Sequence, residues 1–369
     1  MKPHQLAMPA LAALLTLATA GLGVDLLAQE AGEAQEESGA KEPPKLWIDP
    51  IGLVRAGLRV EPEDAPQNTG FDLFDARLGV EGGFGSILEY IVHAGLEPRA
   101  VDKEIEFLDV ALAVTFMPEL HFDVGLYKAP FSREELVWRP DIKFESRAQA
   151  VNAIAPGRQV GAGLSGTFLE ERLEYGVGLF NGNGKSLEND NNSFLYAGRV
   201  QFNNVGPVGF RDEFVIQVGA NAAFSKDSAA DLSRMGGAPA AAEELSAFRG
   251  DRFLWGFDLS SSYRGFFVDA EFLRAELDPL AAEAANLVAQ GGYVQGGYRF
   301  LGGFLEGLVR YDAFDPIEAE DSDYLLIGAN LYYLYHFRFE MQYAIGLHNS
   351  PPTPALSDGQ FIFFLQLRL

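Results

Sequence analysis

Apolar and polar residues alternate with a period of two over most of this sequence, and that alternation restricts the fold more than any other feature. From Leu46 onward it recurs in segments of about 9 to 13 residues. Residues 337–345 read FRFEMQYAI, for example, so one face is apolar or aromatic and the other is charged, amide or alanine. Because a tilted strand of this length spans a bilayer, the pattern predicts membrane-crossing strands with one face toward lipid.

Sixteen such segments can be counted, an even number that suits a closed antiparallel barrel of a single chain. They are residues 46–60, 71–81, 87–97, 106–117, 120–128, 157–168, 172–180, 194–203, 213–224, 253–263, 266–275, 291–300, 303–313, 323–335, 337–347 and 359–369. Short turns alternate with longer polar connections, as in outer-membrane barrels whose short turns face the periplasm. We therefore expect an all-β fold, a 16-stranded antiparallel transmembrane β-barrel over residues 46–369. A soluble secreted pair of β-sandwiches is the alternative.

The N-terminal residues predict an export signal. An apolar run from Leu6 to Val24 follows Lys2, and cleavage is expected after Ala20 or Ala28. Residues 1–28 are therefore predicted to be a signal peptide, with an uncleaved anchor helix as the alternative. Residues 29–45 hold no bulky apolar side chain and are predicted to be a disordered lead-in. Export and barrel together predict the bacterial outer membrane as the location.

Composition excludes several classes of function. The chain has 52 Asp and Glu against 28 Lys and Arg, a net charge of −24, which argues against a nucleic-acid partner. It has no cysteine, and its five histidines are isolated and lack metal-ligand spacing. No nucleophile motif is complete. We therefore expect no enzyme, metal or cofactor, although Glu188–Asn192 offers oxygens that could surround calcium if this loop is not simply solvated.

The third long connection, 129–156, differs from the others. It contains two helix-like stretches around Pro140, Ser132 with Glu135 fits a capping box, and Ser146 could start the second helix. From Lys128 to Arg158 six basic residues face four acidic ones, so the segment is net positive by 6 − 4 = 2. If it folds into the barrel, its basic side chains would line the narrowest point and attract anions. The predicted anion path is Lys128, Arg133, Arg139, Lys143, Arg147 and Arg158.

The alternative is that these basic residues pair with the acidic residues and hold the connection against the wall. Further arginines fall on the polar face or at the ends of the predicted strands, where we expect them to face the lumen among acidic neighbours such as Glu306 and Asp312. They are Arg77, Arg172, Arg199, Arg299 and Arg310.

Four segments resemble one known family. They are GLYKAPFSREEL (Gly125–Leu136), ESRAQAVNAIAPGRQVGAGLSG (Glu145–Gly166), FNGNG (Phe180–Gly184) with a later Gly198-Arg199, and LVRYDAFDP (Leu308–Pro316). In this order they are similar to the phosphate-selective porin O and P family of bacterial outer membranes. The resemblance implies a sixteen-stranded, commonly trimeric barrel with an inward-folded third loop whose basic residues conduct anions. Lys128 matches the family's Lys before that loop.

The sequence therefore predicts an outer-membrane porin that passes small hydrophilic solutes with a preference for phosphate or other small anions. Its expected partners are those solutes, outer-membrane lipid and two further copies of the chain in a homotrimer. The alternative function is a non-conducting barrel whose external loops bind a surface partner.

Overall fold

A closed antiparallel barrel forms the structure. The computed structural model describes residues 45–63, 65, 68–96, 105–205, 214–237, 239–281, 285–334, 336–348 and 356–369. In these ranges, sixteen strands each pair with their sequence neighbours, and β16 closes the ring on β1. The predicted fold class and number of strands are confirmed, and the alternative of two soluble sandwiches is wrong. The predicted signal peptide and residues 29–44 of the lead-in lie outside the described residues.

The strands have the following bounds: β1 Leu46–Val60, β2 Gly70–Phe84, β3 Leu88–Leu96, β4 Ile105–Met117, β5 Leu120–Lys128, β6 Arg158–Phe168, β7 Leu173–Phe180, β8 Leu195–Val205, β9 Phe214–Ala230, β10 Phe248–Tyr263, β11 Phe266–Pro279, β12 Leu287–Phe300, β13 Leu305–Asp315, β14 Ser322–Tyr333, β15 Phe337–Leu347 and β16 Phe361–Arg368. Short helices lie in the connections: α1 Arg133–Leu136, η1 Arg139–Asp141, α2 Gln149–Ile154, η2 Ser233–Met235, α3 Pro239–Leu245 and η3 Leu301–Gly303.

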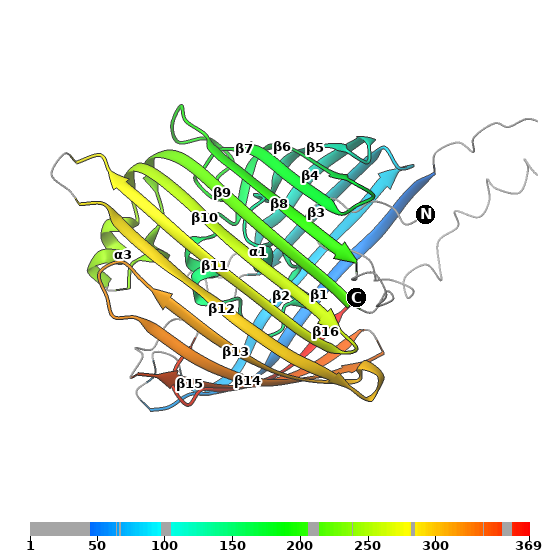
Figure 1. The fold of residues 1–369 in the computed structure, drawn as a ribbon, viewed down its shortest axis with the longest axis vertical. Helices are drawn as coiled ribbons and strands as arrows, with labels where there is room; N and C mark the ends of the chain where they lie inside the picture. The colour runs from blue at the N-terminus through cyan, green and yellow to red at the C-terminus, as the bar shows by residue number, and fades with distance from the viewer. Residues whose placement is uncertain are drawn as a thin grey trace, which may run out of the picture.

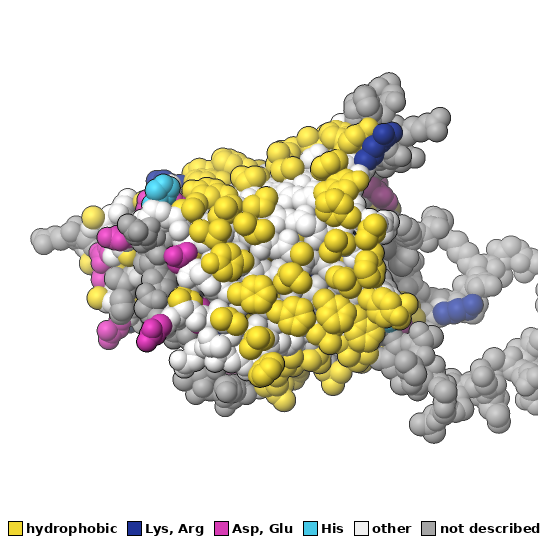
Figure 2. All heavy atoms as spheres, turned by 90° about the horizontal axis from the view of Figure 1, so that it is seen from below, with side chains coloured by type: hydrophobic (Ala, Val, Ile, Leu, Met, Phe, Trp, Pro, Cys, Tyr) yellow, Lys and Arg dark blue, Asp and Glu magenta, His cyan; other side chains and the backbone are white. Residues whose placement is uncertain are grey.

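Strand pairing keeps lipid-facing and interior residues apart. Val309 pairs with Ile327, and these side chains are 44% and 50% exposed. The next pair, Arg310 with Leu326, is buried inside. Hydrophobic side chains consequently cover the middle of the outer wall (Figure 2), as expected where lipid replaces water.

The two ends of the barrel differ. The C-terminus lies at the end opposite α3 (Figure 1), and acidic side chains gather at the α3 end (Figure 2). The long connections, including that with η2 and α3, lie at the α3 end, which is the extracellular end if the short turns are periplasmic. Within the described ranges, no helix is both long and apolar enough to cross a membrane.

The connection between β5 and β6, residues 129–157, is here called L3. The Ser132 hydroxyl accepts the backbone N–H of Glu135 at 3.2 Å, which is one half of the predicted capping box. The other half is not formed, because the Glu135 carboxylate pairs with Arg147 instead. The second helix begins after Ala148 with no side-chain cap, so the prediction that Ser146 starts it is wrong.

Side chains of distant strands hold L3. On β11, the Glu271 carboxylate accepts the backbone N–H groups of Arg133 and Glu134 at 2.9 and 3.1 Å. On β15, Arg338 donates to the carbonyl oxygens of Pro140 and Ile142, each at 2.9 Å. These strands lie on the other side of the ring from β5 and β6. L3 therefore crosses the interior and packs against the far wall.

An outer loop covers L3 on the α3 side. Buried apolar side chains of the β9–β10 connection, among them Leu232, Met235 and Leu245, form one cluster with Val151 and Ile154 of α2. The cluster is apolar on both sides, so burial rather than charge holds this loop on L3. The position of L3 thus depends on the ion pairs of the wall and on a small hydrophobic core.

Candidate functional site

Four arginines gather where L3 meets β2 and β6: Arg77 on β2, Arg139 and Arg147 in L3, and Arg158 on β6. We call them the arginine cluster. Arg77 and Arg139 bind the two oxygens of the same carboxylate, Asp75, with their Nε atoms at 2.7 and 3.1 Å. The shared carboxylate holds two guanidinium groups side by side.

The other two arginines join the same group through their own carboxylates. Arg158 binds Asp109 of β4 through Nε at 3.0 Å and a terminal nitrogen at 2.9 Å. Arg147 lies 3.2 Å from Glu135 and also donates to carbonyl oxygens of L3. These contacts restrict the guanidinium groups, and Arg158 has the two-point geometry of a bidentate arginine pair.

The charges of the arginines in the cluster act on one another. Burial lowers the pKa of Arg147, and the nearby charges of Arg139 and Arg158 lower it further against the opposing effect of Glu135. Burial alone would raise the pKa of Glu135, but Arg147 and Lys128 outweigh it and the pKa falls below its ordinary value. Glu135 is therefore ionised and offsets part of the positive charge.

Exposure separates the cluster from the most deeply buried arginines of the interior. The four side chains keep between 10% and 13% of their surface accessible, whereas Arg55, Arg59 and Arg310 are at most 1% exposed. A solute inside the barrel can therefore reach the cluster, but not those three deeply buried guanidinium groups.

The remaining residues of the predicted anion path anchor L3. Lys128 donates to the L3 carbonyl oxygens of Glu135 and Val137. Arg133 lies 3.2 Å from Asp269 of β11; burial works to lower its pKa, but Asp269 outweighs this and raises it. Lys143 lies 2.7 Å from Glu306 of β13. Burial nevertheless outweighs the effect of that carboxylate and lowers the pKa of Lys143.

Each of the six predicted path residues thus has an acidic or carbonyl partner in the structure. The partners of Arg133, Arg139, Lys143 and Arg158 are carboxylates of the barrel wall, and the Glu135 partner of Arg147 belongs to L3. The alternative of pairing between basic and acidic residues of the connection therefore describes Arg147 with Glu135 and, at 3.7 Å, Arg139 with Glu145. The carboxylates that pair with Arg133, Lys143 and Arg158 lie on the wall.

The predicted lumen arginines have separate environments. Arg77 belongs to the cluster. Arg199 makes two hydrogen bonds to Asp258 of β10, Arg299 lies 3.0 Å from Glu306, and Arg310 binds Glu134 of L3 and Gln295 of β12. Arg172 lies in the exposed turn ahead of β7.

Three residues that matter here were not predicted from the sequence: Asp109, Glu271 and Arg55. Asp109 holds Arg158, and its Oδ2 atom lies 3.0 Å from Nδ1 of His93, while Arg55 donates to the carbonyl of Glu145. Glu271 alternates with the apolar Ala270 and Phe272 and could have been found from the phase of its strand. The His93 partner of Asp109 could not, because a bulge shifts the register beside His93.

No metal centre is indicated. Among the described residues, no group of three or more His, Cys, Asp or Glu side chains could hold a metal ion. In the Glu188–Asn192 loop, the Asn189 and Asn191 side-chain oxygens accept the backbone N–H groups of Asn191 and Ser193.

Comparisons with known proteins identify a family and a fold. The model of the family described as phosphate-selective porin O and P matches residues 56–360. The anion-selective porin from Comamonas acidovorans is 11% identical, with 88% of this chain and 100% of that chain covered and a TM-score of 0.62. In-vitro folded OmpT of Vibrio cholerae in its trimer form is 14% identical, with 88% and 99% covered and a TM-score of 0.58.

The outer membrane channel DcaP of Acinetobacter baumannii is 11% identical, with 88% of this chain and 97% of that chain covered and a TM-score of 0.54. No curated protein sequence matches the chain. At these identities the solved structures establish the fold, and the match to the family model establishes the family to which the chain belongs.

Proposed function

The chain belongs to the phosphate-selective porin O and P family and is a channel protein of the bacterial outer membrane, and from that premise we propose that small anions, phosphate among them, pass it in preference to cations. The family and fold favour a channel over an enzyme. The proposed anion path runs along the arginine cluster rather than along all six basic residues of the L3 segment.

One observation supports this most directly: the guanidinium groups are more exposed than two of the carboxylates that hold them. Arg77 and Arg139 are each 13% exposed against 5% for Asp75, and Arg158 is 12% exposed against 7% for Asp109. When their four carboxylate partners Asp75, Asp109, Glu135 and Glu145 are counted as charged, the cluster sums to 4 − 4 = 0, so the preference for anions rests on exposure and not on net charge. A passing ion meets positive charge first.

Guanidinium groups suit phosphate because their paired N–H donors match two of its oxygens. The donors are already fixed by carboxylates, so an anion gains contacts without ordering long side chains. Each carboxylate also competes for the same N–H groups, so we expect a preference among ions rather than tight binding of one ion.

Planar-bilayer reversal potentials of the pure protein in a KCl gradient test the proposal. We expect the sign that corresponds to chloride passing faster than potassium. A potassium preference would refute it, and absence of any conductance in folded protein would favour the non-conducting barrel whose external loops bind a surface partner.

We also propose a homotrimer, by analogy with the trimer form of OmpT. Light scattering of the detergent-solubilised protein, with detergent mass subtracted, should give three chains per particle. A mass of one chain would refute this part without affecting the anion preference.

A further inference from the structure

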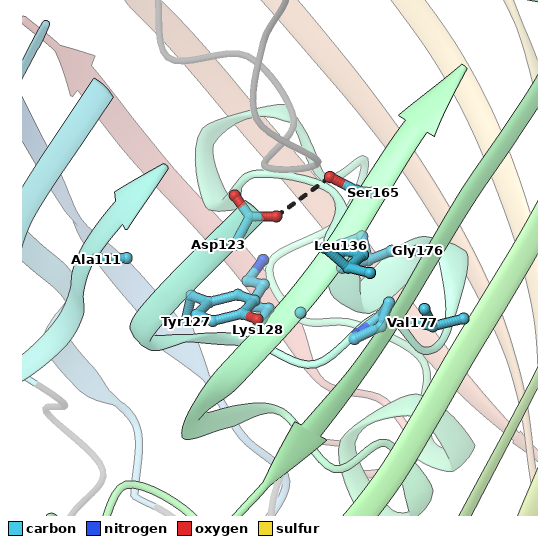
Figure 3. A pocket seen from close by; sticks show the side chains of 11 residues that line it. Ala111, Asp123, Tyr127, Lys128, Leu136, Ser165, Gly176 and Val177 are labelled. Atoms are coloured by element: carbon cyan, nitrogen blue, oxygen red, sulfur yellow. Dashed lines mark hydrogen bonds between the residues drawn. The ribbon is translucent and has the colours of Figure 1, made fainter. Parts of the chain in front are cut away.

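A small cavity lies between L3 and the wall formed by β4–β7, apart from the arginine cluster. Its volume is about 30 Å³. Pro130 and Leu136 of L3 close one side, and Ala111, Gly163 and Gly176 leave room on the wall. Figure 3 shows Asp123, Tyr127 and Ser165 around it, with Asp123 and Ser165 joined by a hydrogen bond.

Two oxygen atoms in this cavity have no hydrogen-bond partner among the described residues. They are Oδ1 of Asp123 and the hydroxyl of Tyr127, and both side chains are more than nine-tenths buried. Asp123 pairs with Gly163 across the sheet, and a Cβ on Gly163 would lie 2.8 Å from the Tyr127 hydroxyl. The carboxylate and the hydroxyl therefore meet over the same bare stretch of backbone.

The charge of Asp123 is not offset by a neighbour. Within the described chain its one hydrogen-bond partner is the Ser165 hydroxyl at 3.1 Å, and no lysine or arginine forms an ion pair with it. Lys128 also lines the cavity, but its ammonium group donates to two carbonyl oxygens of L3. Buried carboxylates elsewhere in the barrel, such as Asp75 and Asp109, do have arginine partners.

An isolated buried carboxylate is strongly unfavourable, so where the chain supplies no partner it takes up either a proton or a cation. The available ligands are oxygens: a carboxylate and two hydroxyl groups. By the same measure one water molecule needs roughly 10–15 Å³, so the cavity admits a bare ion but no bulky organic cation.

We propose that this cavity is a binding site for one compact monovalent cation, a sodium or potassium ion or an ammonium ion, held by Asp123, Tyr127 and Ser165. The ion balances Asp123 and fills the space between the carboxylate and the Tyr127 hydroxyl. Its position behind L3, on the opposite side from the far-wall anchors, makes it a further contact that fixes the start of the loop.

Sodium-23 NMR relaxation of the full-length protein in detergent, with choline as the balancing cation, tests the site. Wild-type protein should broaden the sodium resonance, and potassium or ammonium should remove the broadening whereas N-methyl-D-glucamine should not. Asp123→Asn should abolish the effect, and Tyr127→Phe should weaken the apparent affinity roughly tenfold, as expected for one hydrogen-bonding ligand to a charged group.

Glu174→Gln is the matched control, because Glu174 is a solvent-exposed carboxylate on β7 that bonds only neutral side chains. It should keep the broadening of the wild type. Heat-modifiable migration in gels checks that every variant is folded. Equal broadening by Asp123→Asn and wild type would overturn the proposal, and so would an infrared band of a protonated carboxyl group that disappears in Asp123→Asn.

Discussion

Replacing Arg77 with Gln should weaken anion preference without disturbing L3. Arg77 stands on the wall, and its hydrogen bond goes to Asp75, which keeps Arg139 as a partner after the change. The side chain is 13% exposed, so a passing ion can approach the guanidinium to about 5 Å. The substitution therefore removes one reachable positive charge and leaves the anchors of the loop in place.

The size of the effect follows from Coulomb's law. One charge at about 5 Å contributes about 0.8 kcal/mol in a water-like medium, and screening at 0.1 M salt reduces this to about 0.5 kcal/mol. Its removal disfavours the anion and favours the cation by that amount each, so the permeability ratio should fall roughly fivefold, given tenfold per 1.4 kcal/mol. At 1 M salt the screening length is about 3 Å and the change should be less than about twofold.

Reversal potentials of wild type and Arg77→Gln, measured across tenfold KCl gradients at low and high mean salt, give both numbers. Arg172→Gln is the control, because it removes the same charge from the exposed turn before β7. The reasoning is refuted if Arg77→Gln leaves the low-salt reversal potential unchanged, or if Arg172→Gln shifts it equally.

Three further predictions concern the loop and the wall. Glu271→Ala removes two hydrogen bonds from L3 to a carboxylate, each worth about 1.5–3 kcal/mol, so single-channel current noise should rise. Glu271→Gln should retain part of the anchoring, and a Glu271→Ala channel as quiet as wild type would contradict the prediction. Val309→Arg puts a charge among lipid at a 44% exposed position and should lower the free energy of unfolding in vesicles by about 2–4 kcal/mol. Gln201→Arg on the interior face should change the free energy of unfolding much less. Equal losses in the two variants would argue against the assignment of Val309 to the lipid face and Gln201 to the interior. Burial acts to raise the pKa of Glu135, but Arg147 and Lys128 outweigh burial and lower it. The stabilising charge of Glu135 is therefore fully present above the ordinary pKa of 4.5 and is lost as the pH falls below that value. The difference in melting temperature between wild type and Glu135→Gln should shrink from about pH 6 to about pH 3, and a constant difference would contradict this.

Strand positions were predictable because lipid imposes alternation on the outward face. Where lipid ends, the constraint ends with it. Strand β9 continues to Ala230 and β10 begins at Phe248, beyond the predicted limits of 224 and 253. The outward residues in this extension include Lys226 and Asp251, which pair across the two strands and give no apolar signal.

The residues of the site were predictable, but their partners were not. Arginines in a net positive loop identified Arg139, Arg147 and Arg158 from sequence. The carboxylates that pair with basic residues of the loop lie far away in the sequence and come close through the curvature of the barrel. Asp75 is 64 positions from Arg139, and Glu306 is 163 positions from Lys143. No local pattern encodes such pairs, since they depend on which wall the loop reaches.

The same carboxylates that place the arginines also limit the field these arginines exert. A loop that crosses a barrel must be anchored by interior groups, and in the arginine cluster these groups include acids. The preference for anions then depends on which partner of each pair reaches the solute, and in the pairs with Asp75 and Asp109 that partner is the guanidinium. The mouth at the α3 end is acidic, so an arriving anion meets a repulsive region before the cluster (Figure 2). Exposed charges are screened within about 10 Å at 0.1 M salt, so the repulsion at the mouth fades at a lower salt concentration than the field of the confined cluster. At low salt, anion conductance should therefore grow more than in proportion to the salt concentration.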